Sequence, residues 1–98
     1  MPRTALLFFT ATLLISSHLQ AAGPSASVLA GTCATCHGID GKNAGSVPSI
    51  GGMDMKTLKE ALIAFKSDER KGTIMNRIAK GYTDKEIDAV ARFLATRK

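Results

Sequence analysis

The chain has 98 residues, of which 45% are hydrophobic and 5% aromatic, and its formal net charge is +5. Its Lys and Arg residues are scattered, without the dense runs or interleaved aromatics of a nucleic-acid surface, so we expect no nucleic-acid binding. The positive excess then fits either an ordinary solvated surface or contact with an acidic protein partner.

The first 22 residues have the pattern of a secretory signal peptide. Arg3 precedes an apolar stretch of 11 residues, 5–15, and a run of small residues follows at 21–23. This stretch falls well short of the ~20 residues needed to span a bilayer, so a permanent membrane anchor is the weaker interpretation. We expect cleavage after Ala22 or Gly23, export to the periplasm, and no membrane span in the mature form.

Residues 23–98 form the predicted mature domain. Without Arg3 it keeps 12 of the 13 Lys and Arg residues against 8 Asp and Glu residues, a net charge of +4. Domains below ~70–80 residues rarely gain more than ~3–5 kcal/mol from one apolar core and usually need a disulfide, a metal or another staple. A disulfide between Cys33 and Cys36 would close too small a loop to add much stability. The sequence therefore favours a bound cofactor as the stabilising element.

The first half of the domain predicts one short helix and a long loop. Ser25 or Ser27 can cap a helix through 28–30 that runs into the cysteines. Segment 38–52 contains five glycines together with an asparagine and a proline, a composition that breaks regular structure. We therefore expect an extended loop after the cysteines.

The second half predicts helices only. Asp54 is an N-cap candidate, and apolar residues follow it at helical spacing up to an end near Lys66: Leu58, Ala61, Leu62 and Phe65. A short segment, 73–80, is then bracketed by glycines. Thr83 and Glu86 form a capping box ahead of a last amphipathic helix. No strand pattern is present, so the predicted fold class is all-α.

Residues 33–37 read Cys-Ala-Thr-Cys-His, the C-x-x-C-H signature of c-type haem attachment. At the end of a helix, two cysteines three positions apart can each form a thioether with one vinyl group of the same porphyrin edge. The histidine that follows directly then lies under the iron and can ligate it. The motif predicts one covalent haem c, attached at Cys33 and Cys36, with His37 as an axial ligand.

Other interpretations of the motif have less support. A thioredoxin-like dithiol expects a βαβ context, which the sequence lacks, and a zinc site needs four ligands where the motif offers three. The second histidine, His18, lies in the predicted signal peptide, which leaves His37 as the single histidine of the domain. Two histidine ligands from one chain are therefore excluded.

Three methionines of the domain are candidates for the second axial ligand: Met53, Met55 and Met75. Met75 is the best placed, because it follows His37 by 38 residues and the chain can wrap around the macrocycle between them. It also sits in a short glycine-bounded segment, where its side chain can point inward. The alternatives are Met53, Met55, an open iron, or Met75 as apolar filler of the core.

Methionine ligation predicts what the centre does. A neutral thioether stabilises ferrous iron and raises the reduction potential, and it also closes the sixth coordination position. Oxygen and peroxide then find no free site, so we expect outer-sphere electron transfer and no catalysis. Apolar and aromatic side chains are expected to pack around the haem rather than to carry electrons: Leu58, Leu62, Phe65, Ile78 and Tyr82.

Pro48 has two interpretations. It can stiffen the glycine-rich loop. Alternatively, its carbonyl can accept a hydrogen bond from the ring N–H of His37 on the side away from the iron, which would fix the imidazole and tune its basicity.

The motif at 33–37, the Pro48 loop, Met75 and the capped last helix together resemble class I cytochromes c, over the whole predicted domain. The resemblance implies a few helices wrapped around one haem, with the first and last helices crossing. In this chain, it implies that one of two apolar residues of the first helix packs on the last helix: Val28 or Leu29 on Ala91, Phe93 or Leu94. It also supports the carbonyl role of Pro48.

Segments 65–70 (FKSDER) and 73–82 (TIMNRIAKGY) are similar to the cytochrome subunit of flavocytochrome c sulfide dehydrogenase. In that family the cytochrome accepts electrons from an FAD-containing subunit that oxidises sulfide. Many members join two haem domains, whereas this chain has one C-x-x-C-H motif. The resemblance implies a single-haem form with an FAD-containing sulfide dehydrogenase subunit as its redox partner. With the +4 charge of the domain, we expect this partner to dock over the exposed haem edge near Arg77 and Lys80, which flank Met75 in sequence.

Two hypotheses from different classes follow. The chain is either a fixed subunit of a flavoenzyme with a large interface, or a freely diffusing periplasmic carrier with small, salt-sensitive contacts. A third, a five-coordinate peroxidase or gas-binding haem protein, conflicts with ligation by Met75.

Overall fold

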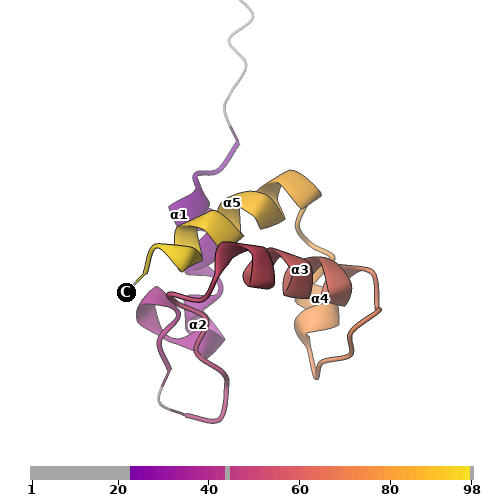
Figure 1. The fold of residues 1–98 in the computed structure, drawn as a ribbon, viewed down its shortest axis with the longest axis horizontal. Helices are drawn as coiled ribbons and strands as arrows, with labels where there is room; N and C mark the ends of the chain where they lie inside the picture. Colours follow the sequence, from indigo (N-terminus) through magenta and orange to yellow (C-terminus); the bar gives the residue numbers. More distant parts are fainter. Residues whose placement is uncertain (1–22, 44, 98) are drawn as a thin grey trace, which may run out of the picture.

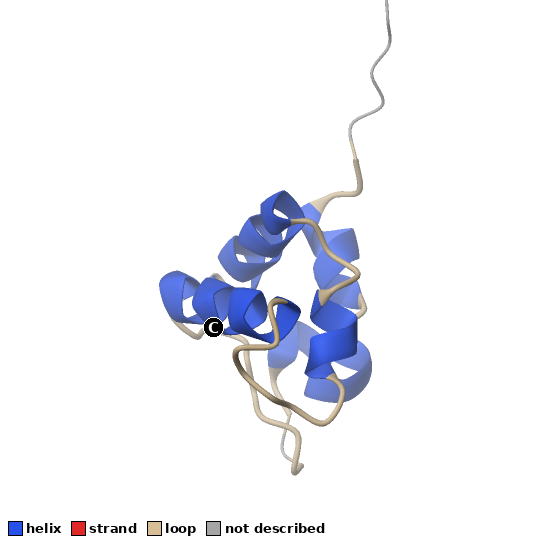
Figure 2. Cartoon of the chain, turned by 90° about the vertical axis from the view of Figure 1, so that its right-hand side faces the viewer, coloured by secondary structure: helices blue, strands red, loops and turns tan. Residues whose placement is uncertain are grey.

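The structure of the protein is a computed structural model that describes residues 23–43 and 45–97. The predicted signal peptide, 1–22, lies outside these residues. In chain order the elements are α1 (Ala26–Gly31), α2 (Ala34–His37), the 3₁₀ turn η1 (Ile39–Gly41), α3 (Met55–Lys66), α4 (Met75–Ala79) and α5 (Asp84–Ala95). The described residues form helices, turns and loops without a strand, which confirms the all-α prediction (Figure 2). Among them, no helix has the length and apolar character needed to cross a membrane.

Three helices begin at side-chain caps that the sequence predicts. At the start of α1, the Ser25 hydroxyl accepts from Val28 N–H at 3.4 Å. At the start of α3, the Asp54 carboxylate accepts from Thr57 N–H at 3.0 Å. At α5 the capping box is complete, because Glu86 N–H donates to Thr83 Oγ1 at 3.1 Å and Thr83 N–H donates to Glu86 Oε1 at 2.9 Å. Each cap satisfies amide groups that a helix start leaves without partners.

The core lies where α1 and α3 pack against α5 (Figure 1). Its buried members come from all three helices: Ala30, Leu58, Val90, Ala91 and Leu94. Leu29 packs against this cluster, as expected for the crossing of the first and last helices. Val28, the other candidate, is 64% exposed. The small Ala30 takes the buried position instead, which lets the backbone of α1 approach α5 closely.

The loop after α2 folds back on itself through its own backbone. Ile50 N–H and Gly51 N–H both donate to Gly41 O, at 2.7 and 3.0 Å. Gly41 has φ 70°, and a Cβ on it would lie 2.6 Å from Gly51 N. A side chain cannot occupy that space, so glycine is required for the close approach. This return brings Pro48 back toward α2.

Candidate haem site

The C-x-x-C-H motif spans the start and the end of α2. Cys33 caps the helix and accepts from His37 N–H at 2.9 Å, so one helical turn holds the motif together. Both cysteines are free thiols, Cys33 partly buried and Cys36 exposed. Burial raises the pKa of the Cys33 thiol, against the opposing effect of a hydrogen bond with Thr32. A raised pKa is the opposite of what a redox dithiol needs for a reactive thiolate.

An apolar hollow brings distant segments of the chain to one place. Its walls come from the start of α2 and from α3, α4, the α4–α5 turn and α5: Cys33, Leu62, Met75, Ile78, Ala79, Tyr82, Ile87 and Val90. Cys33 and Met75 therefore line the same hollow, although more than half of the domain separates them in sequence. Sulfur, aliphatic and aromatic groups of this kind are suited to enclose a flat, largely apolar ligand.

The expected pocket residues fall into two groups. Leu62, Ile78 and Tyr82 line the hollow, as predicted. Leu58 does not, because it is buried in the core between α3 and α5. Phe65 also lies elsewhere, under the guanidinium of Arg70 at 4.8 Å from the ring centroid. These two residues do not line the hollow, since one apolar face of α3 is shared between α5, the hollow and the following loop.

The imidazole of His37 is fixed by the loop that follows it. His37 Nδ1 lies 2.6 Å from Pro48 O. A carbonyl oxygen can only accept, so Nδ1 carries a proton, and in the neutral ring Nε2 then keeps its lone pair for a metal. The contact expected between His37 and Pro48 is therefore present, with the tautomer that an iron ligand requires.

Asn43 holds the same loop, and the sequence did not single it out for this role. Its Nδ2 group donates to Val47 O at 3.0 Å and, at 3.4 Å, to Cys36 O within the motif. Its Oδ1 accepts from Gly45 N–H at 3.1 Å. One side chain thus ties the Pro48 loop to α2. An asparagine inside a glycine-rich loop is the only signal in the sequence that could have indicated it.

Met75 is the one of the three candidate methionines that lines the hollow. Met53 is 37% exposed, and Met55 packs against the core cluster. Tyr82 closes another side, where its hydroxyl donates to Leu29 O at 3.2 Å and contacts Thr32 Oγ1 just before the motif. This contact links the α4–α5 turn to the end of α1.

Arg77 and Lys80, the two basic residues expected at the docking face, differ in their surroundings. Arg77 is exposed on α4, next to Ile78, which lines the hollow and is 36% exposed. Lys80 instead pairs with Asp68, and this hydrogen bond is the main cause that holds the pKa of the Asp68 carboxyl below its usual range. A partner that approaches this face therefore meets one open positive charge and one that is already paired.

The donor set fits a covalent haem c. Two free thiols stand one helical turn apart, the adjacent imidazole has Nε2 available, and a thioether lies in the wall of the same apolar hollow. Thiols suit thioether attachment, while imidazole and thioether suit the two axial positions of haem iron.

The family model described as Cytochrome c matches residues 24–98. The chain is 44% identical over 66 residues to the cytochrome subunit of sulfide dehydrogenase from Chlorobaculum tepidum, which covers 67% of this chain and 60% of that protein. It is 39% identical over 93 residues to the thiosulfate dehydrogenase electron acceptor of Stutzerimonas stutzeri, covering 86% and 43%. It is 34% identical over 67 residues to cytochrome c-553 of Desulfomicrobium norvegicum, covering 65% and 84%.

The chain thus spans less than two thirds of the length of the first two relatives and most of the third. The family match extends over the hollow, the C-x-x-C-H motif and every helix described above. The chain belongs to the cytochrome c family, whose members are electron-transfer proteins that carry covalently bound haem c.

Proposed function

We propose that this chain transfers single electrons through one haem c, attached at Cys33 and Cys36 and ligated by His37 and Met75. The observation that carries the proposal is the position of Cys33 and Met75 in the walls of one apolar hollow. The bound haem supplies the one-electron redox couple. The chain's own residues hold and tune it, and they exclude water from one side of it.

Each ligand side has a defined task. The Pro48 carbonyl keeps the proton of His37 on Nδ1, which orients the imidazole and raises the basicity of Nε2. The Met75 thioether is neutral and soft, so it favours the reduced state and raises the potential. When bound to the iron, it would also occupy the position at which peroxide or a gas would bind. Ligation by Met75 therefore favours a carrier over the five-coordinate peroxidase or gas-binding alternative.

We further propose that a dehydrogenase flavoprotein supplies the electrons, with an FAD-containing sulfide dehydrogenase subunit as the first candidate. The relative from Chlorobaculum tepidum is a cytochrome subunit of sulfide dehydrogenase, and the one from Stutzerimonas stutzeri is an electron acceptor for thiosulfate dehydrogenase. The proposed docking face surrounds α4, where Arg77 is exposed beside the hollow. Docking there would shorten the electron path.

A freely diffusing carrier is the second candidate. The chain spans 84% of a small cytochrome c-553 but only 60% of the sulfide dehydrogenase subunit, and it holds one C-x-x-C-H motif. In either role we propose that residues 1–22 act as a signal peptide, cleaved after Ala22 or Gly23, and that the domain works in the periplasm. The apolar stretch at 5–15 and the small residues at 21–23 support this.

Purification of the haem-loaded protein from its native source tests both the covalent attachment of haem and the choice between a subunit and a free carrier. Haem that leaves the polypeptide in acid-acetone would overturn covalent attachment, and Cys36→Ala is expected to keep one thioether at most. A flavoprotein that co-elutes through moderate salt supports the subunit role, because its interface should exceed ~1,200 Å² with an apolar core. No co-eluting flavoprotein, together with a reduction rate that falls steeply with ionic strength, supports the free carrier.

The docking face is tested in the same assay by charge reversal. Arg77→Glu is expected to slow reduction by the native donor more than Lys80→Glu does, since the Lys80 charge is already paired with Asp68. Unchanged kinetics in the double variant would overturn the proposed face in both roles.

A further inference from the structure

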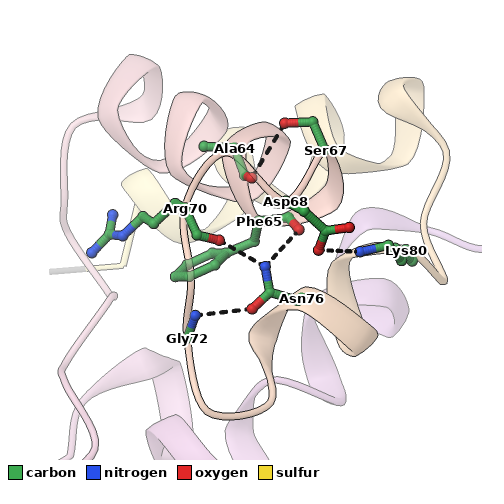
Figure 3. A network of polar contacts seen from close by, with 8 residues as sticks. All are labelled: Ala64, Phe65, Ser67, Asp68, Arg70, Gly72, Asn76 and Lys80. Carbon is green, nitrogen blue, oxygen red and sulfur yellow. Dashed lines mark hydrogen bonds and ion pairs between the residues drawn. The ribbon is translucent and has the colours of Figure 1, made fainter.

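Asn76 follows Met75 directly, and its side-chain amide closes the loop that joins α3 to α4, the Met75 loop, residues 67–74 (Figure 3). Asn76 Nδ2 donates to Phe65 O at 3.1 Å and to Arg70 O at 2.7 Å. Asn76 Oδ1 accepts from Gly72 N–H at 2.9 Å. One side chain thus satisfies three backbone groups that belong to the end of α3 and to both halves of the loop.

No other residue type of similar size can make these three bonds. An aspartate keeps an acceptor for Gly72 N–H but offers no hydrogen to the two carbonyls. A leucine or an alanine makes none of them. A glutamine has the same groups on a longer stem, which displaces them by one methylene. The network therefore depends on the amide of Asn76 itself.

Helix α4 has no side-chain cap of its own to fix its first turn, although it packs against α3. It consists of only five residues, Met75–Ala79, and its N-cap, Ile74, makes no side-chain capping bond. Helices this short are not stable without outside contacts. The direction of the Met75 side chain, which leaves the first residue of α4, is thus set by what anchors the loop and the helix to α3.

The loop is also packed directly beneath the methionine. A Cβ on Gly72 would lie 2.9 Å from Phe65 Cε1 and 3.5 Å from Met75 Cβ, so the glycine backbone is seated between these two side chains. The bond from Gly72 N–H to Asn76 Oδ1 holds that backbone in place. A second link between the loop and α4, the pair of Lys80 and Asp68, lies at the exposed surface and is worth little in water.

We propose that Asn76 is a positioning residue for Met75: its amide holds the loop and the start of α4 so that the thioether stays in the haem pocket. This inference rests on the proposed function, in which Met75 is the second axial ligand. Loss of the amide should shift the equilibrium between bound and released Met75 by about tenfold to a hundredfold, the value of one to two ordinary hydrogen bonds.

The test uses the full haem-loaded protein and two Asn76 variants. Asn76→Asp keeps the size and one acceptor but removes both donors, and Asn76→Ala removes all three bonds. Lys80→Gln is the matched control, because it breaks the other link between the same loop and α4. Met75→Ala gives the reference for a lost ligand. The readouts are the sulfur-to-iron charge-transfer band of the ferric protein, the rate of carbon monoxide binding to the ferrous protein, and hydrogen exchange of the Gly72 amide.

Both Asn76 variants are expected to weaken the band, to bind carbon monoxide about tenfold or more faster, and to lose protection at Gly72, while Lys80→Gln stays like the wild type. A wild-type band and carbon monoxide rate in Asn76→Asp and Asn76→Ala would overturn the inference. An equal change in Lys80→Gln would overturn it too, because the loss of any contact between the loop and α4 would then release Met75. If the wild type itself lacks the band, the ligand assignment to Met75 fails and the inference fails with it. If Asn76→Ala does not retain haem, Asn76→Asp decides.

Discussion

The two sides of the haem site are held in different ways. His37 ends α2, which contains Cys36 and is capped by Cys33, and the loop after it, residues 38–43 and 45–54, is fixed by backbone bonds to Gly41 and by Asn43. Met75 begins a five-residue helix without a side-chain cap, and its loop depends on one amide and one exposed ion pair. The His37 side is held by several backbone and side-chain bonds, whereas the Met75 side is held by a few side-chain bonds and by the packing of α4 on α3.

This difference indicates which side of the haem site should open first. His37 is tethered next to a proposed thioether and cannot move far without breaking α2. Met75 is joined to the rest of the site only through folded structure, and its bond to iron would close a long loop of chain. A reversible opening that exposes the iron, or that precedes unfolding, is therefore expected on the Met75 side.

The largest expected effect comes from Met75→Ala. It removes the proposed ligand and the cross-link between distant segments, so we expect a lower potential, rapid carbon monoxide binding and a free energy of unfolding reduced by at least ~2 kcal/mol, the lower range for truncation of a packed methionine. Guanidinium titration followed by haem absorbance measures the loss. Met53→Ala is the matched control, because Met53 is exposed. A Met75→Ala protein with the potential and stability of the wild type would leave Met53 or Met55 as the ligand.

A smaller effect is expected from Asn43→Ala on the opposite side. Val47 O would lose its partner in a partly buried position, which costs ~1–3 kcal/mol. Because the Met75 loop is untouched, the sulfur-to-iron band should remain. Ser46→Ala, at an exposed position of the same loop, is the control and should change neither quantity. Loss of the band in Asn43→Ala would show that the two sides of the haem site are coupled and are not held independently.

The features that the sequence predicted are those with local causes. The Asp54 cap and the capping box of Thr83 and Glu86 involve residues three apart, and the C-x-x-C-H motif lies within one helical turn. Their geometry follows from helix periodicity alone. The site's two asparagines, Asn43 and Asn76, bind carbonyls whose positions depend on the full path of a loop, so spacing could not indicate them.

The same reason explains why Leu58 and Phe65 do not line the hollow. A helical pattern shows that α3 has an apolar face but not which neighbour covers each part of it. Leu58 faces α5, whereas Leu62, one turn later, reaches the hollow, and Phe65 lies below the next loop. Met75, which was chosen for its reach around a ligand rather than for periodicity, does line the hollow, and its role as iron ligand stays a prediction.

The smallest expected effect is a pH dependence confined to the Met75 side. Its hydrogen bond with Lys80 lowers the pKa of Asp68 in the folded state, so the pair stabilises the loop above the usual Asp pKa of ~3.9 and this contribution is lost as the pH falls through the folded value. Asp68→Asn removes the titration and keeps a side chain that tolerates the positive φ of 64° at this position. Between about pH 5 and pH 3, a range that brackets the usual Asp pKa, we expect the free energy of unfolding to fall less in Asp68→Asn than in the wild type.

Asp88→Asn is the control for this acid response, because Asp88 also has a lowered pKa, caused first by Lys59 and then by Arg92, but it links α3 to α5 away from the Met75 loop. Both variants should reduce the acid sensitivity of global stability, whereas only Asp68→Asn should alter how the sulfur-to-iron band fades on acidification. The band reports the Met75 side alone, so it separates loop opening from unfolding. A band that fades identically in the wild type and in both variants would mean that the ion pair adds nothing to the hold on Met75, and that Asn76 and the packing of Gly72 hold that side by themselves.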